Sequence, residues 1–223
     1  MLEEKPYGKR IKTAIKTIFK PKSSYIFALL PFLLYAIFPA PSMAENKSCA
    51  LNEQKLSSLK KSRSGEFTNV IMAQDPFYAG DLTFKNADGK EVKVSDFKGQ
   101  TVFLNLWATW CGPCREEMPD IAKVQDEKAD DSLAVVAVNV DKQEDSYVHD
   151  FLKEYKADNL PFYRDTSMAI FYKLRREGLA LGLPTTLIID KDGCLTASLI
   201  GSAPWGDADA MKFIDKVKEL DAQ

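Results

Sequence analysis

The sequence predicts an α/β fold in which helices lie on the faces of a central mixed sheet, and three features lead to this prediction. Two continuous apolar runs, TVFLNLWA at 101–108 and LAVVAVNVD at 133–141, are typical of strands in a sheet that is covered on both faces. Two Asp-Gly pairs, Asp88-Gly89 and Asp192-Gly193, lie between apolar stretches and indicate hairpins. Segments with helical spacing of apolar residues follow the buried strands.

The first element expected is a short amphipathic helix in a polar N-terminal extension, residues 45–75. Leu51, Leu56 and Leu59 allow this helix, with Cys49 at its start. The segment 81–94, DLTFKNADGKEVKV, then predicts two strands joined at Asp88-Gly89. Residues 76–223 form the main domain in this division of the chain.

The buried strand 101–108 leads directly into a helix over WCGPCREEMPDIAKVQDEKA, 110–129. After the strand 133–141, the segments 146–157 and 166–178 are helical, and Gly178 ends the second. The segments 183–190 and 194–201 form the second hairpin, and 208–220 is the closing helix. The predicted order is β-β-β-α-β-α-α-β-β-α.

Composition bounds the class of protein. The chain has 223 residues, 45% of them hydrophobic and 28% charged, which is enough for one domain with a sizeable core and an extension. The formal net charge is −2, so the composition does not favour a nucleic-acid partner.

Residues 1–44 predict a membrane segment. A basic stretch from Lys5 to Lys22 precedes the apolar run 25–41, which places the N-terminus in the cytoplasm and exports the rest of the chain. The run is short for a spanning helix and contains Pro31, and Ser42-Met43-Ala44 offers a cleavage site. Cleavage after Ala44 and retention as a signal anchor both stay open, and the long basic stretch favours the anchor.

Cys111 and Cys114 lie at the start of the helix that follows the first buried strand. There the unpaired backbone N–H groups and the helix dipole favour the thiolate of Cys111. Pro113 suits the first helical turn because it has no N–H to leave unpaired. Cys111 can then attack a disulfide in a partner, and Cys114 can attack Cys111 to release the reduced partner.

Other uses of this Cys-x-x-Cys pair have less support. A structural zinc site needs two further ligands, and the chain offers only His149 and the distant Cys49 and Cys194. Copper would require more His or Met near the thiols than Met118. A purely structural disulfide rarely encloses Gly-Pro at a strand-to-helix junction. We therefore expect a redox pair and neither a metal nor a bound cofactor.

Several motifs together resemble those of a known family. WATWCGPC at 107–114, Pro119 in the following helix and GLPTT at 182–186 resemble the thioredoxin fold. The hairpin at 81–99, the phrase FLNLWATWCGPCREEMP, the inserted βα unit at 133–157 and the N-terminal membrane segment resemble the TlpA-type membrane-tethered thioredoxins of bacteria. The resemblance covers roughly Cys49 to the C-terminus.

The resemblance implies a substrate-binding surface around the thiols. Pro184 is the expected cis-proline facing the disulfide, with the backbone of Leu183 available to pair with an extended client segment. Trp110, Gly112 and Pro113 are the expected contact surface. Trp107 is expected to pack beneath the thiols.

Two polar positions concern proton transfer. Glu117 occupies the position of an acid in relatives that serve cytochrome assembly, where it is a candidate base for Cys114; a surface salt bridge is the alternative. Cytoplasmic thioredoxins have a buried aspartate where this chain has Asn105, which cannot titrate. Proton transfer is therefore expected to involve Glu117, water or another group.

Cys49 and Cys194 are expected to form a structural disulfide, because two remaining cysteines in an exported domain favour pairing. TlpA-like relatives with a second disulfide support this pairing, which would attach the extension to the turn at 191–193. A role of one of these cysteines in relaying electrons stays open.

The resulting functional prediction is a periplasmic protein-disulfide reductase, tethered to the bacterial inner membrane. The family implies a transmembrane thiol reductase as electron donor, and oxidised clients from cytochrome or copper-site assembly. Gly-Pro between the cysteines favours a reductant over an oxidase or isomerase. A thiol-based metal-binding assembly factor is the alternative of another class, and a peroxide-reducing enzyme has less support.

Overall fold

A computed structural model describes residues 49–65 and 67–223. The predicted membrane segment and the cleavage site after Ala44 lie outside these residues. Within them, no helix has the length and apolar character needed to cross a membrane. The elements are α1 (Glu53–Ser62), β1 (Ile71–Met72), β2 (Thr83–Asn86), β3 (Glu91–Lys93), η1 (Val94–Phe97), β4 (Thr101–Trp107), α2 (Gly112–Lys128), β5 (Leu133–Asn139), α3 (Asp145–Glu154), β6 (Tyr163–Arg164), α4 (Ala169–Arg176), β7 (Thr185–Ile189), β8 (Leu195–Ile200) and α5 (Ala208–Asp221).

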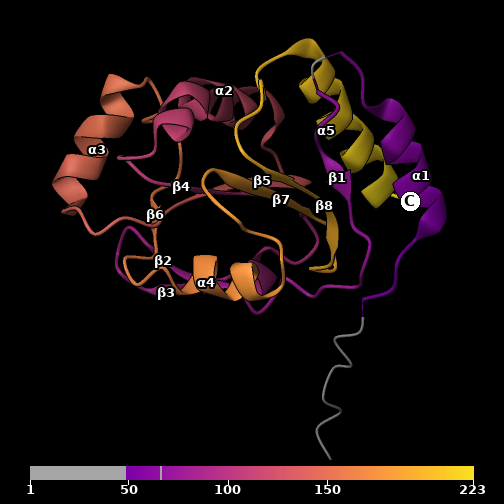
Figure 1. Cartoon of the computed structure of the whole chain (residues 1–223), viewed down its shortest axis with the longest axis horizontal. Coiled ribbons are helices and arrows are strands. Elements are labelled where there is room, and N and C mark those ends of the chain that lie inside the picture. The colour runs from indigo at the N-terminus through magenta and orange to yellow at the C-terminus, as the bar shows by residue number, and fades with distance from the viewer. Residues whose placement is uncertain (1–48, 66) are drawn as a thin grey trace, which may run out of the picture. The chain divides into compact units, whose positions relative to one another are not determined.

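The eight strands form one mixed sheet in the order β1-β8-β7-β4-β5-β6-β2-β3. The central strand β4 runs parallel to β5 and antiparallel to β7. Helices α2 and α5 pack against each other and α4 lies on the opposite side of the sheet (Figure 1). The predicted α/β architecture with a central mixed sheet is therefore confirmed.

The centre of the sheet is almost completely buried. Every residue of β4 is buried, and all but one residue of β5 is buried, as expected for strands covered on both faces. The C-terminal end of β4 leads into α2 through residues 108–111, so the rigid centre of the sheet fixes the start of that helix.

Two short strands were not predicted from the sequence. β1 pairs with β8 at one edge of the sheet, and β6 joins β5 to the β2–β3 hairpin. Each has only two residues, which is too short for a two-residue periodicity to appear.

The helix boundaries differ from the predictions by a few residues. The N-cap of α1 is Asn52, whose side chain accepts a hydrogen bond from Lys55 N, so Cys49 precedes the helix instead of starting it. α4 begins at Ala169 because Asp165 accepts hydrogen bonds from Ser167 N and Ile170 N. α3 ends at Glu154, shortly before the left-handed residue Lys156.

Candidate active site

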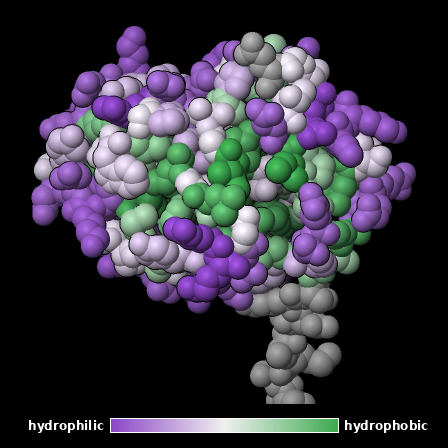
Figure 2. All heavy atoms as spheres, viewed as in Figure 1, coloured by the Kyte–Doolittle hydropathy of each residue, from purple (hydrophilic) through white to green (hydrophobic). Residues whose placement is uncertain are grey.

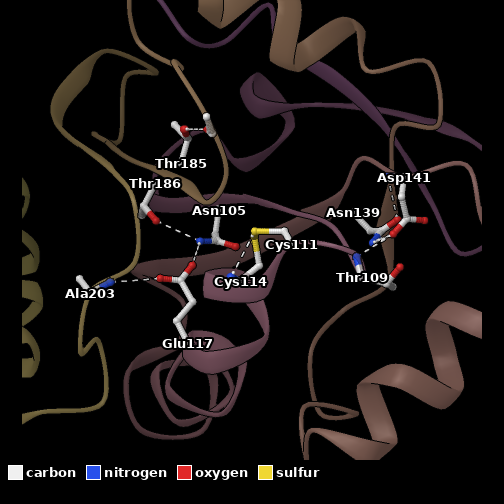
Figure 3. Close-up of a disulfide and its surroundings, with 11 residues drawn as sticks. Asn105, Thr109, Cys111, Cys114, Glu117, Asn139, Asp141, Thr185, Thr186 and Ala203 are labelled. Atoms are coloured by element: carbon white, nitrogen blue, oxygen red, sulfur yellow. Dashed lines mark hydrogen bonds between the residues drawn. A yellow bond between two sulfur atoms is a disulfide. The ribbon is translucent and has the colours of Figure 1, made fainter.

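Cys111 and Cys114 form a disulfide at the first turn of α2 (Figure 3). Cys111 is the N-cap residue, and its sulfur accepts a hydrogen bond from Cys114 N at 3.2 Å. Cys111 is 5% exposed, whereas Cys114 is fully buried. The cap donor stabilises negative charge on the Cys111 sulfur, which is the sulfur nearer the surface.

The residues around Cys111 differ in exposure. Trp110, directly before it, is 61% exposed, and Pro113 is exposed in the first turn of α2. An added Cβ at Gly112 would meet no atom within 4 Å, so the space beside the first turn is open. The open surface next to Cys111 leaves room for a partner chain.

Pro184 lies at the end of β7 that adjoins the cysteines. The Leu183–Pro184 peptide bond is cis, and the following residue, Thr185, pairs with Leu106 near the end of β4. This register places Leu183 and Pro184 at the same end of the sheet as the start of α2. The sequence-predicted substrate-binding residues therefore lie at one end of the sheet.

One face of the molecule is apolar in its middle (Figure 2). Figure 2 shows hydrophobic residues across the middle of one face, surrounded by hydrophilic ones, and the connection from α4 to β7 crosses this region in the same view of Figure 1. Leu181 in that connection is 70% exposed, the highest value among the exposed large hydrophobic side chains of the described residues. Exposed apolar side chains such as Trp110 and Leu181 fit contact with another chain.

Glu117 lies one turn after Cys114 on α2 and is only 2% exposed, so the alternative of a surface salt bridge is wrong. Asn105 Nδ2 donates a hydrogen bond to its Oε1 at 2.9 Å, and Ala203 N donates to its Oε2 at 3.2 Å. Burial raises the pKa of Glu117 from its usual 4.5 to about 8, and the charge of Asp120 adds to this effect. These hydrogen bonds only partly offset the loss of hydration. Glu117 therefore holds its proton at neutral pH next to the buried cysteine.

Asn105 connects two elements beneath the disulfide. Besides Glu117, its Nδ2 donates to Thr186 Oγ1 on β7 at 3.0 Å (Figure 3). Thr186 belonged to the GLPTT motif but had no predicted role, and Ala203 was not singled out in the sequence. Their roles depend on the pairing of β4 with β7 and on the loop before α5.

A second polar cluster, also missed from the sequence, supports the loop between β4 and α2. Asp141 is buried after β5, and its Oδ2 accepts hydrogen bonds from Thr109 N at 2.8 Å and Asn139 Nδ2 at 3.0 Å. Arg164 Nη2 donates to the carbonyl oxygen of Asp141 at 3.1 Å. Asp141 thus holds the backbone directly before Trp110.

Trp107 is buried and its ring stacks on Phe151 of α3, with the ring centroids 5.3 Å apart. This contact joins α3 to the end of β4. Trp107 was expected to pack beneath the thiols; the structure shows that it is buried and that its ring lies on Phe151.

Cys49 and Cys194 form a second disulfide, with a sequence separation of 145 residues. Lys55 Nζ on α1 also lies 3.5 Å from Asp190 Oδ2 and contacts Asp221 at the end of α5. The extension is therefore attached to the sheet and to α5 by a covalent bond and ion pairs. In the described part of the chain, no group of three or more His, Cys, Asp and Glu side chains is arranged to hold a metal ion.

A disulfide at the N-terminus of a helix, a cis-proline at the adjoining strand end and this sheet topology together define the class of thioredoxin-like thiol-disulfide oxidoreductases. The Redoxin family matches residues 66–214. The chain therefore belongs to the Redoxin family.

The names of two similar proteins fit this class. The chain is 33% identical over 126 residues to the thiol-disulfide oxidoreductase ResA of Bacillus subtilis. The match covers 56% of this chain and 66% of ResA, so the chain spans slightly less than two thirds of the length of ResA. It is 37% identical over 135 residues to the thioredoxin-like protein YneN of the same organism, covering 58% and 73% of the two chains. These matches confirm the predicted family resemblance.

The structural comparison confirms the predicted thioredoxin-like fold. A thiol:disulfide interchange protein of the thioredoxin family from Chlorobium tepidum has a TM-score of 0.53 and 25% sequence identity. The match covers 66% of this chain and 99% of that protein. The matched part thus corresponds to nearly the whole of that smaller domain.

Proposed function

We propose that this protein is a membrane-tethered disulfide reductase whose catalytic domain works in the bacterial periplasm. The observation that supports this most directly is the cap geometry of the cysteine pair, with Cys114 N donating to the Cys111 sulfur. The basic stretch and apolar run of residues 1–44 support the tether and the export. Gly112 and Pro113 between the cysteines favour a reducing pair.

In the first step, the thiolate of Cys111 attacks one sulfur of a client disulfide. A bond forms between Cys111 and the client, and the second client sulfur leaves as a thiolate that takes a proton from solvent. The exposed ring of Trp110 and the backbone of Leu183 hold the client segment in an extended conformation.

In the second step, Cys114 loses its proton to Glu117, which became a carboxylate when it gave its own proton to Cys114 during reduction of the pair. Cys114 then attacks the Cys111 sulfur. The Cys111–Cys114 disulfide forms, and the other client sulfur leaves as a thiolate that takes a proton from solvent. Reduction of the enzyme by a dithiol donor runs the same sequence backwards. The protonated Glu117 then supplies a proton to the departing Cys114 thiolate.

The family resemblance supports a specific electron donor and specific clients for this reaction. The donor is a transmembrane thiol reductase that brings electrons into an oxidising compartment. The clients are cysteine pairs that must be reduced before haem attachment or copper-site assembly, and Glu117 is the acid shared with relatives of the cytochrome type.

The test uses the full chain in detergent. The wild type, reduced beforehand with a dithiol, is expected to reduce an oxidised client peptide that contains a Cys-x-x-Cys-His sequence. Cys111→Ser is expected to abolish this reaction, and Cys114→Ala is expected to accumulate a mixed disulfide with the peptide.

The matched control is the double variant Cys49→Ser/Cys194→Ser, which leaves Cys111 and Cys114 intact. It is expected to keep the reductase activity. Undiminished reduction by Cys111→Ser would contradict the proposed mechanism.

A further inference from the structure

The amide of Asn105 is paired on one side only. It is fully buried on β4, and its Nδ2 donates to both Glu117 Oε1 and Thr186 Oγ1. Its Oδ1 is buried without a hydrogen-bond partner. Figure 3 shows this oxygen directed toward the disulfide, on the side of the amide away from Glu117.

A buried carbonyl oxygen without a donor is rare, because it has lost its hydration without compensation. One other buried side-chain oxygen of the described residues lacks a partner, Gln125 Oε1. Gln125 lies about three turns further along α2 than Cys114. The unpaired acceptor at the cysteines is therefore that of Asn105.

We propose that Asn105 is a positioning residue for the redox reaction: its Oδ1 accepts a hydrogen bond from the Cys114 thiol when the disulfide is reduced, while its Nδ2 holds the Glu117 carboxylate. The hydrogen bond is direct or passes through one water. This inference rests on the proposed dithiol–disulfide exchange at Cys111 and Cys114.

The chemistry of reduction supplies the missing donor. In the disulfide form neither cysteine carries an S–H, so nothing on Cys114 can donate to Oδ1. When a dithiol donor reduces the pair, the S–S bond breaks, the donor is oxidised to its disulfide, and Cys111 and Cys114 each gain one hydrogen. Cys114 is buried, so its new S–H needs an acceptor from the protein.

The same amide also suits the proton transfer. The departing Cys114 thiolate takes a proton from Glu117, which leaves a carboxylate. Nδ2 then donates to a charged oxygen instead of a neutral one, which strengthens that hydrogen bond. Both ends of the Asn105 amide are thus better paired in the reduced protein than in the oxidised protein.

The test is the equilibrium of the Cys111–Cys114 pair with dithiothreitol, measured on the full chain in detergent. Asn105→Leu removes both polar ends with little change in size. We expect the ratio of disulfide to dithiol to rise at least fivefold, which corresponds to a midpoint potential about 20 mV more negative. If Asn105→Leu fails to fold, Asn105→Ala supplies the same comparison.

The matched control is Thr101→Val, which removes a buried hydroxyl at the other end of the same strand. It is expected to lower stability without moving the potential. A second arm repeats Asn105→Leu in the Glu117→Gln background, where titration at position 117 is absent. There the shift is expected to persist.

An unchanged potential in Asn105→Leu would overturn the inference, and so would an equal shift in Thr101→Val. Failure of the proposed function has a different signature. In that case the wild type itself would not reduce the client peptide, whatever the potential of the Asn105 variants.

Discussion

Cys114 N donates a hydrogen bond to the sulfur of Cys111 at 3.2 Å, so the cap of α2 is formed by the sulfur that the mechanism requires as nucleophile. A capping acceptor with negative charge is more strongly bound than a neutral one. The helix therefore favours the thiolate of Cys111, which is the N-cap residue, over that of Cys114, which lies inside the first turn.

Selective alkylation tests this difference. In the reduced full chain at neutral pH, iodoacetamide is expected to modify Cys111 at least about tenfold faster than Cys114, because the former is both favoured as thiolate and nearer the surface. Peptide mapping by mass spectrometry gives the two rates. Equal rates would contradict the assignment of the nucleophile.

The burial of Glu117 predicts a pH-dependent stability of the oxidised protein. Its pKa is raised from 4.5 to about 8, so the folded state disfavours the carboxylate relative to the unfolded state. No stability is lost below about pH 4.5, and the loss grows as pH rises toward 8. Between these two pH values, each tenfold fall in proton concentration costs on the order of 1.4 kcal/mol, so the full loss reaches several kcal/mol.

Urea unfolding at several pH values measures this effect. Glu117→Gln is expected to remove most of the decline in the free energy of unfolding between pH 5 and 9. The control is Glu116→Gln, because Glu116 is the neighbouring residue of α2 and is exposed; this variant is expected to keep the decline. A decline of the same size in Glu117→Gln would show that another group is responsible.

Asp141 is expected to matter for the loop that carries the cysteines. Asp141→Ala leaves Thr109 N and Asn139 Nδ2 without their buried acceptor, which should lower the free energy of unfolding by roughly 1–3 kcal/mol. It should also slow client reduction, because Trp110 and Cys111 follow Thr109 directly.

Asp150→Ala is the matched control for Asp141, because it removes the same side chain from an exposed pair with Lys153. Its effect on stability should stay within about 0.5 kcal/mol. Chemical denaturation and steady-state reduction rates report both quantities. Similar results for the two variants would contradict the role of Asp141.

The Cys49–Cys194 disulfide is expected to stabilise the domain without contributing to the redox reaction. The two cysteines are 145 residues apart in the sequence. In the chain-entropy model, closing a loop of this length raises the free energy of unfolding by about 5 kcal/mol. Cys49→Ser/Cys194→Ser should therefore unfold at much lower urea concentration. A changed potential of the Cys111–Cys114 pair in this variant would instead support electron relay.

The sequence predicted the elements that have strong local patterns. Strands such as β4 are continuous apolar runs, and the hairpins carry Asp-Gly turns, so a single stretch of chain contains the information. The position of Cys111 at a helix start was likewise visible in the order of strand, Gly-Pro and amphipathic segment. Local patterns thus account for the fold class and the cysteine pair.

The remaining parts depend on contacts between distant segments. β6 becomes a strand because β5 and β2 lie on either side of it. For Glu117 the sequence left a surface salt bridge as the alternative, whereas in the structure it is buried and accepts a hydrogen bond from Ala203 N in the loop before α5. Asn105 was predicted as a position that cannot titrate, but its unpaired oxygen became visible only once Thr186 and Glu117 were seen on its other side.

The most direct test of the reductase proposal is the redox potential of the Cys111–Cys114 pair in the full chain, with Cys49→Ser/Cys194→Ser as the control that isolates it. Equilibration with glutathione and dithiothreitol buffers, followed by thiol quantification, gives the value. The proposal predicts a potential near about −270 mV, as in reducing thioredoxins. A potential near about −120 mV, as in a strong disulfide oxidant, would contradict it.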